Sequence, residues 1–410
     1  MDTAAGRRRT VEEHRAVVAA LLAGCSPGTE EVPVAEAAGR VLAEDVLAAV
    51  PLPVFTNSAM DGYAARWADV GGASAGAPVR LPVAADLPAG RTEVPPLEPG
   101  TVHRIMTGAP LPDGADVVVP VESTDGGTAT VAISGAPAAG TFLRHAGEDL
   151  AAGATALPAG TVLGPAQLGL AASVGRAAVV VRRRPRVLVL STGSELVAPG
   201  EPLAHGQIHE SNSLVLAAAV TAAGGAARTL HFVPDDVDQF LTTVRAELAS
   251  ADVLVTSGGV SMGAYEVVKD ALGALGTVEF VGVAMQPGGP QGAGTVDGVP
   301  VVTLPGNPVS SFVSFEVFVR PALRAALGVP GPDRVELTAR LAGPLTSPAG
   351  RRQYLRGRFS SGTVELVGGA GSHLVAHLAR ADCLVVVPED VTELPAGGEV
   401  QVVLIGGALQ

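Results

Sequence analysis

Three loops rich in small residues each follow a short apolar run that predicts a buried β-strand. They read Ser-Thr-Gly-Ser-Glu at 191–195, Ser-Gly-Gly-Val-Ser-Met-Gly at 257–263 and Pro-Gly-Asn-Pro-Val-Ser at 305–310. Small residues let backbone N–H groups face a ligand, and the second and third loops lead into predicted helices, whose N-termini bind anions. Ordinary helix initiation, with Asn307 as the N-cap before Pro308, is the structural alternative. Three such loops at one sheet edge favour an anion site.

The second loop allows two more specific interpretations. Residues 258–263 have P-loop glycine spacing, but Ala264 and Tyr265 stand where a P-loop has Lys and Ser or Thr, which argues against a nucleoside triphosphate. Residues 259–263 also match G-x-S-x-G, the pattern of a hydrolase nucleophile elbow, with Ser261 as the nucleophile. His373 or His377 would then be the base, and neither has an evident acid partner. A serine hydrolase stays an alternative.

Carboxylates close to these loops could hold Mg²⁺, which bridges to phosphate oxygens. An acidic rim exposed to solvent is the alternative. Lys269 follows Glu266 by three positions on a predicted helix, so it could bind phosphate or form an exposed ion pair. His373 and His377 have metal-like spacing without a third ligand nearby, which argues against zinc. The carboxylates are Glu195, Glu210, Asp235, Asp236 and Glu266.

Three polar segments mark the N-terminal half. Residues 57–63 read Asn-Ser-Ala-Met-Asp-Gly-Tyr and have too few apolar positions to be predicted as core. Residues 104–110 read Arg-Ile-Met-Thr-Gly-Ala-Pro, and Arg144 precedes Gly-Glu-Asp at 147–149. Turn chemistry explains each segment alone, but loops of this kind often carry function.

The loops need a scaffold that brings strand ends together, and residues 186–327 predict one. Apolar strands alternate with helices there, which is typical of a parallel sheet covered on both faces. Ligands bind beyond the carboxyl ends of such strands. The predicted strands are Val187–Leu190, Thr229–Val233, Val253–Thr256, Val278–Val283 and Val301–Leu304, and the helices are Leu214–Ala223, Val237–Leu248, Tyr265–Leu275 and Val309–Leu327.

The flanking segments predict smaller units. A capping box at Thr10 and Glu13 opens a helix that Gly24 should close, and further helices are predicted at 34–48 and 165–173. Short strands are predicted at Val102–Met106 and Val117–Val121, then at Val335–Leu341, Leu384–Val387 and Val400–Ile405.

We therefore predict a multidomain α/β protein around a doubly wound, mostly parallel sheet. Residues 1–50 and 141–180 would form an N-terminal helical and extended linker domain, and residues 51–140 an inserted β-rich module. Residues 181–330 would form the α/β domain, and residues 331–410 a small C-terminal β-barrel domain.

Composition excludes several classes of protein. The chain has 410 residues, more than one core supports. Its 27 basic and 40 acidic residues give a net charge of −13, which argues against nucleic-acid binding. No apolar run is long enough to span a membrane, and charged residues follow the Arg7–Arg9 cluster where an export signal would be apolar. We expect a cytoplasmic protein with Cys25 and Cys383 as buried thiols.

At these motifs the chain resembles the molybdopterin molybdenumtransferase family, which includes MoeA proteins and the gephyrin E domain. The matching residues occur in family order across nearly the whole chain. They are Asn57–Tyr63, Ile105–Pro110, Gly147–Asp149, Ser191–Glu195, Ser257–Ser261 and Leu304–Pro308.

The resemblance implies an enzyme that inserts molybdenum from molybdate into adenylylated molybdopterin with Mg²⁺ and releases AMP. It implies a homodimer with the active site between subunits, with molybdopterin adenylyltransferase and apo-molybdoenzymes as partners. Catalytic roles would fall on Asp61, Thr107, Asp149, Glu195 and Lys269, and metal binding on Glu195, Glu210, Asp235 and Glu266. Substrate and anion binding would fall on Ser257, Gly258, Gly259, Ser261, Pro287, Pro305, Gly306, Asn307, Arg356 and Ser372.

The chain departs from the family pattern at several of these positions. Ser194, Glu210 and Glu266 stand where Asp is common. Gly289 stands where the family commonly has Lys, and Gln286 where it sometimes has Lys. Loss of a lysine contact costs roughly 1.5–3 kcal/mol of anion binding. An arginine such as Arg351, Arg352 or Arg356 would have to compensate. The alternatives are a gephyrin-like scaffold with weak catalysis, or a paralogue acting on a related pterin or on tungstate, which resembles molybdate in size and charge.

Overall fold

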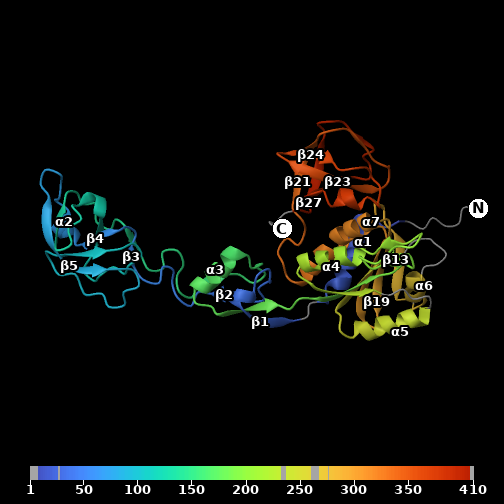
Figure 1. The fold of residues 1–410 in the computed structure, drawn as a ribbon, viewed down its shortest axis with the longest axis horizontal. Coiled ribbons are helices and arrows are strands. Elements are labelled where there is room, and N and C mark those ends of the chain that lie inside the picture. Colours follow the sequence, from blue (N-terminus) through green and yellow to red (C-terminus); the bar gives the residue numbers. More distant parts are fainter. Residues whose placement is uncertain (1–7, 26–27, 232–236, 260–266, 276, 407–410) are drawn as a thin grey trace, which may run out of the picture.

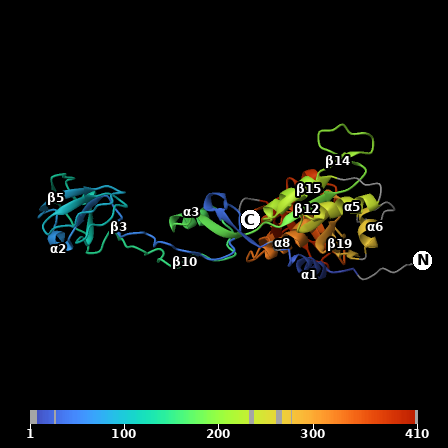
Figure 2. The ribbon, with the colours of Figure 1, turned by 90° about the horizontal axis from the view of Figure 1, so that it is seen from below.

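The computed structural model describes the chain except residues 1–7, 26–27, 232–236, 260–266, 276 and 407–410. The molecule is elongated, with a small β-rich body at one end, a narrow middle part and a larger body at the other end (Figure 1). The perpendicular view agrees and shows a loop projecting from the larger body between β13 (Leu196–Val197) and β14 (Ile208–His209) (Figure 2). Among the described residues, no helix is long and apolar enough to cross a membrane.

The larger body is built on a six-stranded sheet with the order β15-β12-β16-β20-β19-β17. The first four strands are parallel, and β19 and β17 each run antiparallel to a neighbour, which confirms the predicted mostly parallel sheet. The sequence pattern missed β19 because glycines interrupt it. A Cβ on Gly294 would lie 2.0 Å from the Thr277 carbonyl oxygen, so this strand requires glycine. The strands are β12 (Arg186–Ser191), β15 (Ala226–His231), β16 (Val253–Ser257), β17 (Val278–Gly282), β19 (Pro290–Val296) and β20 (Val299–Leu304).

Helices cover both faces of this sheet, as a doubly wound fold requires. Because side chains alternate along a strand, Val187 and Val189 of β12 join the core under α1, α4, α7 and α8, and Leu188 joins the core under α5 and α6. The long helix predicted at 309–327 contains a π-helical segment, η3 (Phe315–Val319). The helices are α1 (Val11–Leu22), α4 (Asn212–Ala222), α5 (Val237–Leu248), α6 (Val267–Ala274), α7 (Pro308–Ser314) and α8 (Arg320–Ala326).

Helix α1 begins at the predicted capping box. The Glu13 N–H donates to the Thr10 hydroxyl at 3.1 Å, and the Thr10 N–H donates to the Glu13 carboxylate at 2.9 Å. The helix packs against α8 and η3, so α1 is part of the larger body.

In the narrow middle part, the prediction of a helix at 34–48 is wrong. Only η1 (Val34–Glu36) is helical, Gly39 has φ +71°, and β2 (Val46–Leu47) pairs with β10 (Thr155–Leu157). The apolar spacing of this segment suits helix, but its backbone N–H groups bond to other segments, as in Leu42 to the Thr161 oxygen at 2.9 Å. The remaining elements here are β1 (Thr29–Pro33), α3 (Pro165–Ser173) and β11 (Ala178–Arg182), of which α3 has its predicted bounds.

The β-rich body is a five-stranded sheet in the order β7-β4-β6-β5-β8, joined to the middle part by two chain segments. The expectation that 57–63 lies outside the core is wrong in part. Tyr63 is fully buried and donates its hydroxyl to the Gly127 oxygen at 2.9 Å, so one aromatic residue anchors a polar segment. The elements are β3 (Asn57–Ser58), β4 (Gly62–Ala65), α2 (Trp67–Val70), β5 (Val79–Leu87), β6 (Val102–Ile105), β7 (Val117–Pro120), η2 (Val121–Ser123), β8 (Thr130–Ile133) and β9 (Leu143–Arg144).

A small closed barrel forms the C-terminal part. Its strands run β23-β24-β21-β27-β25, and β25 pairs back with β23 to close it. Strand β18 of the larger body, residues Met285–Gln286, also pairs with β23 and fixes the barrel beside the sheet. Cys25 and Cys383 are buried free thiols, as predicted. The elements are β21 (Glu336–Leu341), β22 (Leu345–Thr346), β23 (Arg352–Ser360), β24 (Thr363–Leu366), α9 (Val375–Leu378), β25 (Cys383–Val387), β26 (Glu393–Leu394) and β27 (Glu399–Leu404).

Candidate functional site

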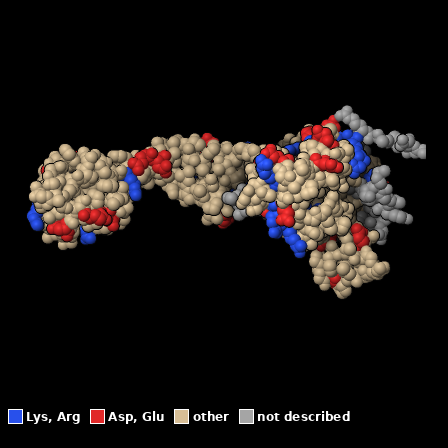
Figure 3. Space-filling view, turned by 90° about the horizontal axis from the view of Figure 1, so that it is seen from above, with Lys and Arg blue, Asp and Glu red and all other residues tan. Residues whose placement is uncertain are grey.

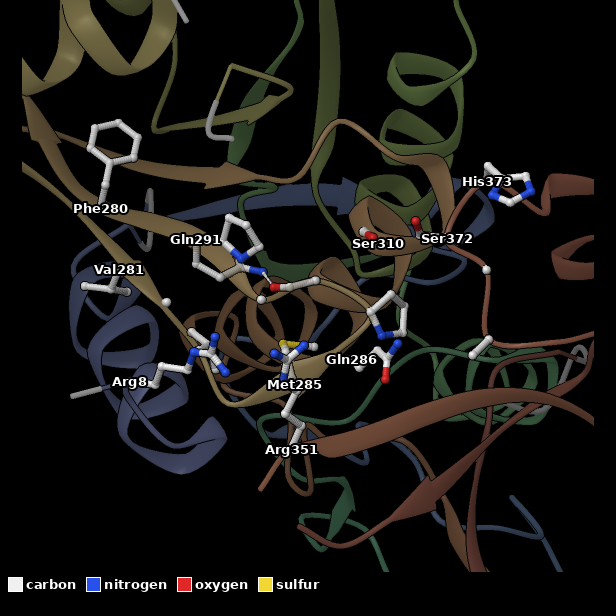
Figure 4. A pocket seen from close by; sticks show the side chains of 18 of the residues that line it. Arg8, Phe280, Val281, Met285, Gln286, Gln291, Ser310, Arg351, Ser372 and His373 are labelled. Atoms are coloured by element: carbon white, nitrogen blue, oxygen red, sulfur yellow. Dashed lines mark hydrogen bonds between the residues drawn. The ribbon is translucent and has the colours of Figure 1, made fainter. Parts of the chain in front are cut away.

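A pocket of about 830 Å³ lies where the larger body meets the C-terminal barrel (Figure 4). Residues 280–283 and 285–291 form one wall, and residues 370–373 lie on another. Three cationic side chains, Arg8, Lys269 and Arg351, line it, and none of the described lining residues is Asp or Glu. A cavity lined by one sign of charge concentrates ions of the opposite sign. The pocket is therefore suited to anions.

Two of the loops rich in small residues, 257–259 and 305–307 (the glycine loops), meet at the ends of their strands, as predicted. Ser257 at the end of β16 is 1% exposed, and its hydroxyl accepts a hydrogen bond from the Asn212 amide at 2.8 Å. The same amide donates to the Gly306 oxygen at 2.6 Å. Gly258 and Gly259 have φ of +95° and +70°, which L side chains rarely adopt. The predicted anion-binding residues Ser257, Gly258, Gly259, Pro305 and Gly306 thus lie together, whereas Ser261 lies outside the described residues.

Asn307 links the glycine loops to the pocket. It is the N-cap residue of α7, but its side chain makes no capping bond to that helix. Its amide instead donates to the Ser372 hydroxyl at 2.9 Å, and the backbone carbonyl oxygen of Ser372 accepts from the Val309 N–H at 3.1 Å. The side chain of Asn307 therefore holds a pocket residue in place.

Arg356 supports the same loop from within the barrel. Its guanidinium donates to the Gly371 oxygen at 3.1 Å and to the Gly369 oxygen, and it is only 3% exposed. Burial lowers the pKa of this arginine. The predicted oxyanion residue Arg356 therefore lies behind the pocket wall and positions Gly371 and Ser372, whereas Ser372 and Pro287 line the pocket.

A second cluster of predicted residues lies in the β-rich body. Asp61 accepts hydrogen bonds on one oxygen from the Thr107 N–H at 2.6 Å and the Thr107 hydroxyl at 2.7 Å. These bonds from Thr107, with the charge of Arg104, lower the pKa of Asp61. Asp149 is exposed where the chain returns to the middle part. The pocket is lined by residues of α6 and β19, which lie in the larger body at the opposite end of the molecule (Figure 1). One chain thus brings Asp61 and Thr107 together but keeps them far from Lys269.

The predicted metal ligands fit Mg²⁺ only in part. Glu195 is exposed, and its carboxylate folds over Gly193. Glu210 is 4% exposed and accepts two hydrogen bonds from Ser213 at the start of α4, at 2.8 Å and 2.6 Å. Carboxylates are the ligands that Mg²⁺ prefers, so Glu195 could bind it. The Glu210 carboxylate is already hydrogen-bonded to Ser213 at the start of α4. Asp235 and Glu266 lie outside the described residues, and the rest of the described chain holds no cluster of three metal-ligating residues.

Comparisons with known proteins cover nearly the whole chain. Residues 9–175 match the MoeA N-terminal region (domains I and II), 188–325 a probable molybdopterin binding domain and 338–405 the MoeA C-terminal region (domain IV). Molybdopterin molybdenumtransferase 2 of Mycobacterium tuberculosis (strain ATCC 25618 / H37Rv) is 54% identical over 402 residues, 96% of this chain and 99% of that protein. The chain belongs to the molybdopterin molybdenumtransferase (MoeA) family.

Other MoeA-family proteins agree over similar lengths. Molybdopterin molybdenumtransferase 1 of the same strain is 41% identical over 423 residues, 97% of this chain and 99% of that protein. A crystal structure of a molybdopterin biosynthesis MoeA protein from Pyrococcus horikoshii has a TM-score of 0.81 at 34% identity and covers 98% of this chain and 100% of that chain. The resemblance drawn from the motifs is confirmed.

Two positions that depart from the MoeA pattern both line the pocket. The Gln286 oxygen accepts from the Gln353 amide at 3.3 Å, and Gly289 accepts from the Val283 N–H at 2.7 Å. A Cβ on Gly289 would lie no closer than 3.4 Å to its neighbours, so the fold leaves room for a side chain there. Of the arginines expected to compensate, only Arg351 lines the pocket.

The sequence reasoning missed Arg8 as a pocket residue. The Arg7–Arg9 cluster suggests only an export signal, because residues 7–9 lie far in sequence from residues 280–291 of the pocket wall. Thr10 gives only a partial signal, since a capping box starts the helix at Val11 and leaves the residues before it outside that helix.

Proposed function

We propose that this protein is a molybdopterin molybdenumtransferase that inserts molybdenum from molybdate into adenylylated molybdopterin and releases AMP. Membership of the MoeA family supports the reaction class. The observation that carries the proposal is the pocket, in which Arg8, Lys269 and Arg351 face a cavity without a carboxylate among its described lining residues. Molybdate and the phosphates of the substrate are anions that such a cavity favours.

Each part of the site has a separate task in this proposal. The loops at Ser257–Gly259 and Pro305–Asn307 would lie against the phosphate, with the Gly258 N–H already bonded to the Leu304 oxygen, and Lys269 would add a positive charge. Asn307 and Arg356 position Ser372 to donate to an oxyanion. Such a site works by preorganised donors, and no side-chain nucleophile is needed.

Mg²⁺ is part of the proposal as a cofactor. Glu195 would hold it, with Glu210, Asp235 and Glu266 as further candidate ligands. When bound, it would neutralise charge on the phosphate oxygens. Removal of Mg²⁺ with EDTA should abolish AMP release, and added Mg²⁺ should restore it.

We propose a homodimer, which the separation of the two residue clusters supports. Asp61, Thr107 and Asp149 could act on the pocket only if the β-rich body of a second copy reached it. The other proposed partners are molybdopterin adenylyltransferase, which supplies the substrate, and apo-molybdoenzymes, which accept the product.

We propose a cytoplasmic location. On the face shown in Figure 3, acidic side chains gather where the β-rich body joins the middle part, and no continuous basic surface is visible for a nucleic acid.

AMP release tests the function directly. Purified protein with adenylylated molybdopterin, molybdate and Mg²⁺ should release AMP, and omission of molybdate or Mg²⁺ is the control. No AMP above background would refute the proposal and favour a scaffold. Lys269→Ala should weaken substrate affinity about tenfold, since it removes one charge-assisted contact.

A further inference from the structure

The cations of the pocket come from three separate parts of the chain. Lys269 lies on α6, Arg8 on the segment before α1, and Arg351 directly before β23. In Figure 4, Arg8 and Arg351 point into the part of the pocket beside Val281 and Met285, away from Ser372. Two guanidinium groups thus lie at one end of the pocket, whereas Ser310, which is the described lining residue from the loops at 257–259 and 305–310, lies beside Ser372 (Figure 4).

The backbone fixes Arg8 in this place. The Arg9 N–H donates to the Gly282 oxygen at 3.0 Å, and the Arg9 oxygen accepts from the Ala284 N–H at 2.8 Å. Arg9 pairs with Glu279, and Arg8, its neighbour in an extended segment, projects into the pocket. A Cβ on Gly282 would lie 3.4 Å from the Arg8 Cγ, so glycine at this position leaves space for the arginine stem.

Arg351 is fixed through the same stretch of backbone. The Arg352 N–H donates to the Ala284 oxygen at 2.9 Å, so Ala284 is bonded through its N–H to one arginine segment and through its C=O to the other. Arg352 pairs with Glu12, and with Glu389 at 3.0 Å, and is used in holding α1 to the barrel. Arg351 lines the pocket.

Neither Arg8 nor Arg351 has an ion pair or hydrogen bond through its side chain within the described part of the chain, in contrast to Arg9, Arg352 and Arg356. Three arginines in this neighbourhood are thus bound to protein groups, whereas Arg8 and Arg351 present their N–H groups to the cavity. A guanidinium fork matches the oxygens of a tetrahedral anion and binds two of them at once.

We propose that Arg8 and Arg351 form a paired binding site for a tetrahedral oxyanion, held in register by Ala284. The anion is either molybdate or a phosphate group of the pterin substrate; this assignment, but not the binding itself, rests on the proposed function. Because each arginine belongs to a different part of the chain, the site forms only when the N-terminal segment and the barrel are both docked on 282–286.

Calorimetric titration of the full chain with molybdate, inorganic phosphate and AMP tests this pair. Arg8→Gln and Arg351→Gln should each weaken binding of one of these anions about tenfold, and the double variant more. Arg358→Gln, which removes an exposed arginine of the same barrel, is the charge-matched control and should bind as the wild type does. Gly289→Lys, which places a cation in the same pocket, should restore part of the affinity of the double variant.

The outcomes separate the candidate anions and the two proposals. If the double variant loses only molybdate binding, the anion bound by the two arginines is molybdate. If it loses only phosphate and AMP binding, the anion is the phosphate group of the substrate. Unchanged binding of all three anions by the double variant overturns the inference, as does a wild type that binds none of them. If the glutamine variants do not fold, Arg8→Lys with Arg351→Lys takes their place and should bind the anion more weakly, since lysine lacks the fork. Measurement of AMP release by the wild type tests the proposed function separately.

Discussion

Asn307→Asp separates helix capping from a role in the pocket. Asp and Asn are equivalent N-cap residues, and a negative charge at a helix N-terminus adds about 0.3–1 kcal/mol of stability. If Asn307 serves the helix, the variant should be as stable as the wild type and fully active. In the structure, however, the Asn307 amide donates to Ser372 rather than to the helix.

The expected loss can be estimated from this contact. An Asp at 307 cannot donate to the Ser372 hydroxyl and instead accepts its proton, so Ser372 no longer donates to an oxyanion, which costs about 1 kcal/mol of binding free energy. Its charge repels an oxyanion in the pocket by about a further 1 kcal/mol, reduced because residue 307 is exposed. Together these predict roughly thirtyfold weaker molybdate binding.

Calorimetry with molybdate and urea unfolding of the same samples test this estimate. The free energy of unfolding should be unchanged or slightly higher, while the Kd for molybdate rises. Asn307→Ser keeps a capping residue without the charge and should lose only about fivefold. Wild-type affinity in the Asp variant would refute the assignment of Asn307 to Ser372.

Three further substitutions probe separate features. Burial lowers the pKa of His14 to about 4, so unfolding between pH 6.5 and 4 takes up a proton, and stability should fall with decreasing pH by up to about 1.4 kcal/mol per unit. His14→Leu should remove this slope in urea unfolding followed across that range. Glu210→Ala leaves the buried donors of Ser213 without their acceptor and should cost about 1–3 kcal/mol in urea unfolding, with the exposed Glu201→Ala as the control. Asp61→Asn should reduce AMP release without changing molybdate binding. Because the pKa of Asp61 is lowered, its contribution to stability is present above the unfolded carboxyl pKa near ~3.9 and is lost at lower pH, so acid unfolding of the variant should be flatter there.

The parts of the fold that the sequence predicted are those that local rules govern. Helix α5 has its predicted bounds, because Phe240, Val244 and Leu248 are buried along one face at helical spacing. The segment 34–48 has similar spacing and is extended, because its backbone bonds to residues far away in sequence. Strand β23 was missed because buried Gln353 and Arg356 interrupt its apolar pattern.

The candidate site divides in the same way. Residues 257–259 and 305–307 were predicted to meet because parallel strands end at one edge. Arg8 could not be placed in the pocket from the sequence, because its position depends on the pairing of its neighbour Arg9 with Val283, which only the folded chain provides. The role of Asn307 was also ambiguous, since its capping position and its bond to Ser372 are both compatible with the sequence. The division into four domains stays a prediction.

The distance between the Asp61–Thr107 cluster and the Lys269 pocket has a genetic consequence. If each active site takes one cluster from either subunit, a chain carrying Asp61→Asn and a chain carrying Lys269→Ala each have only impaired sites when alone. A mixed dimer regains one intact site, so random mixing of the two chains should restore roughly a quarter of all sites. Complementation between two defective alleles is therefore expected, whereas two alleles altered within the same cluster should not complement each other.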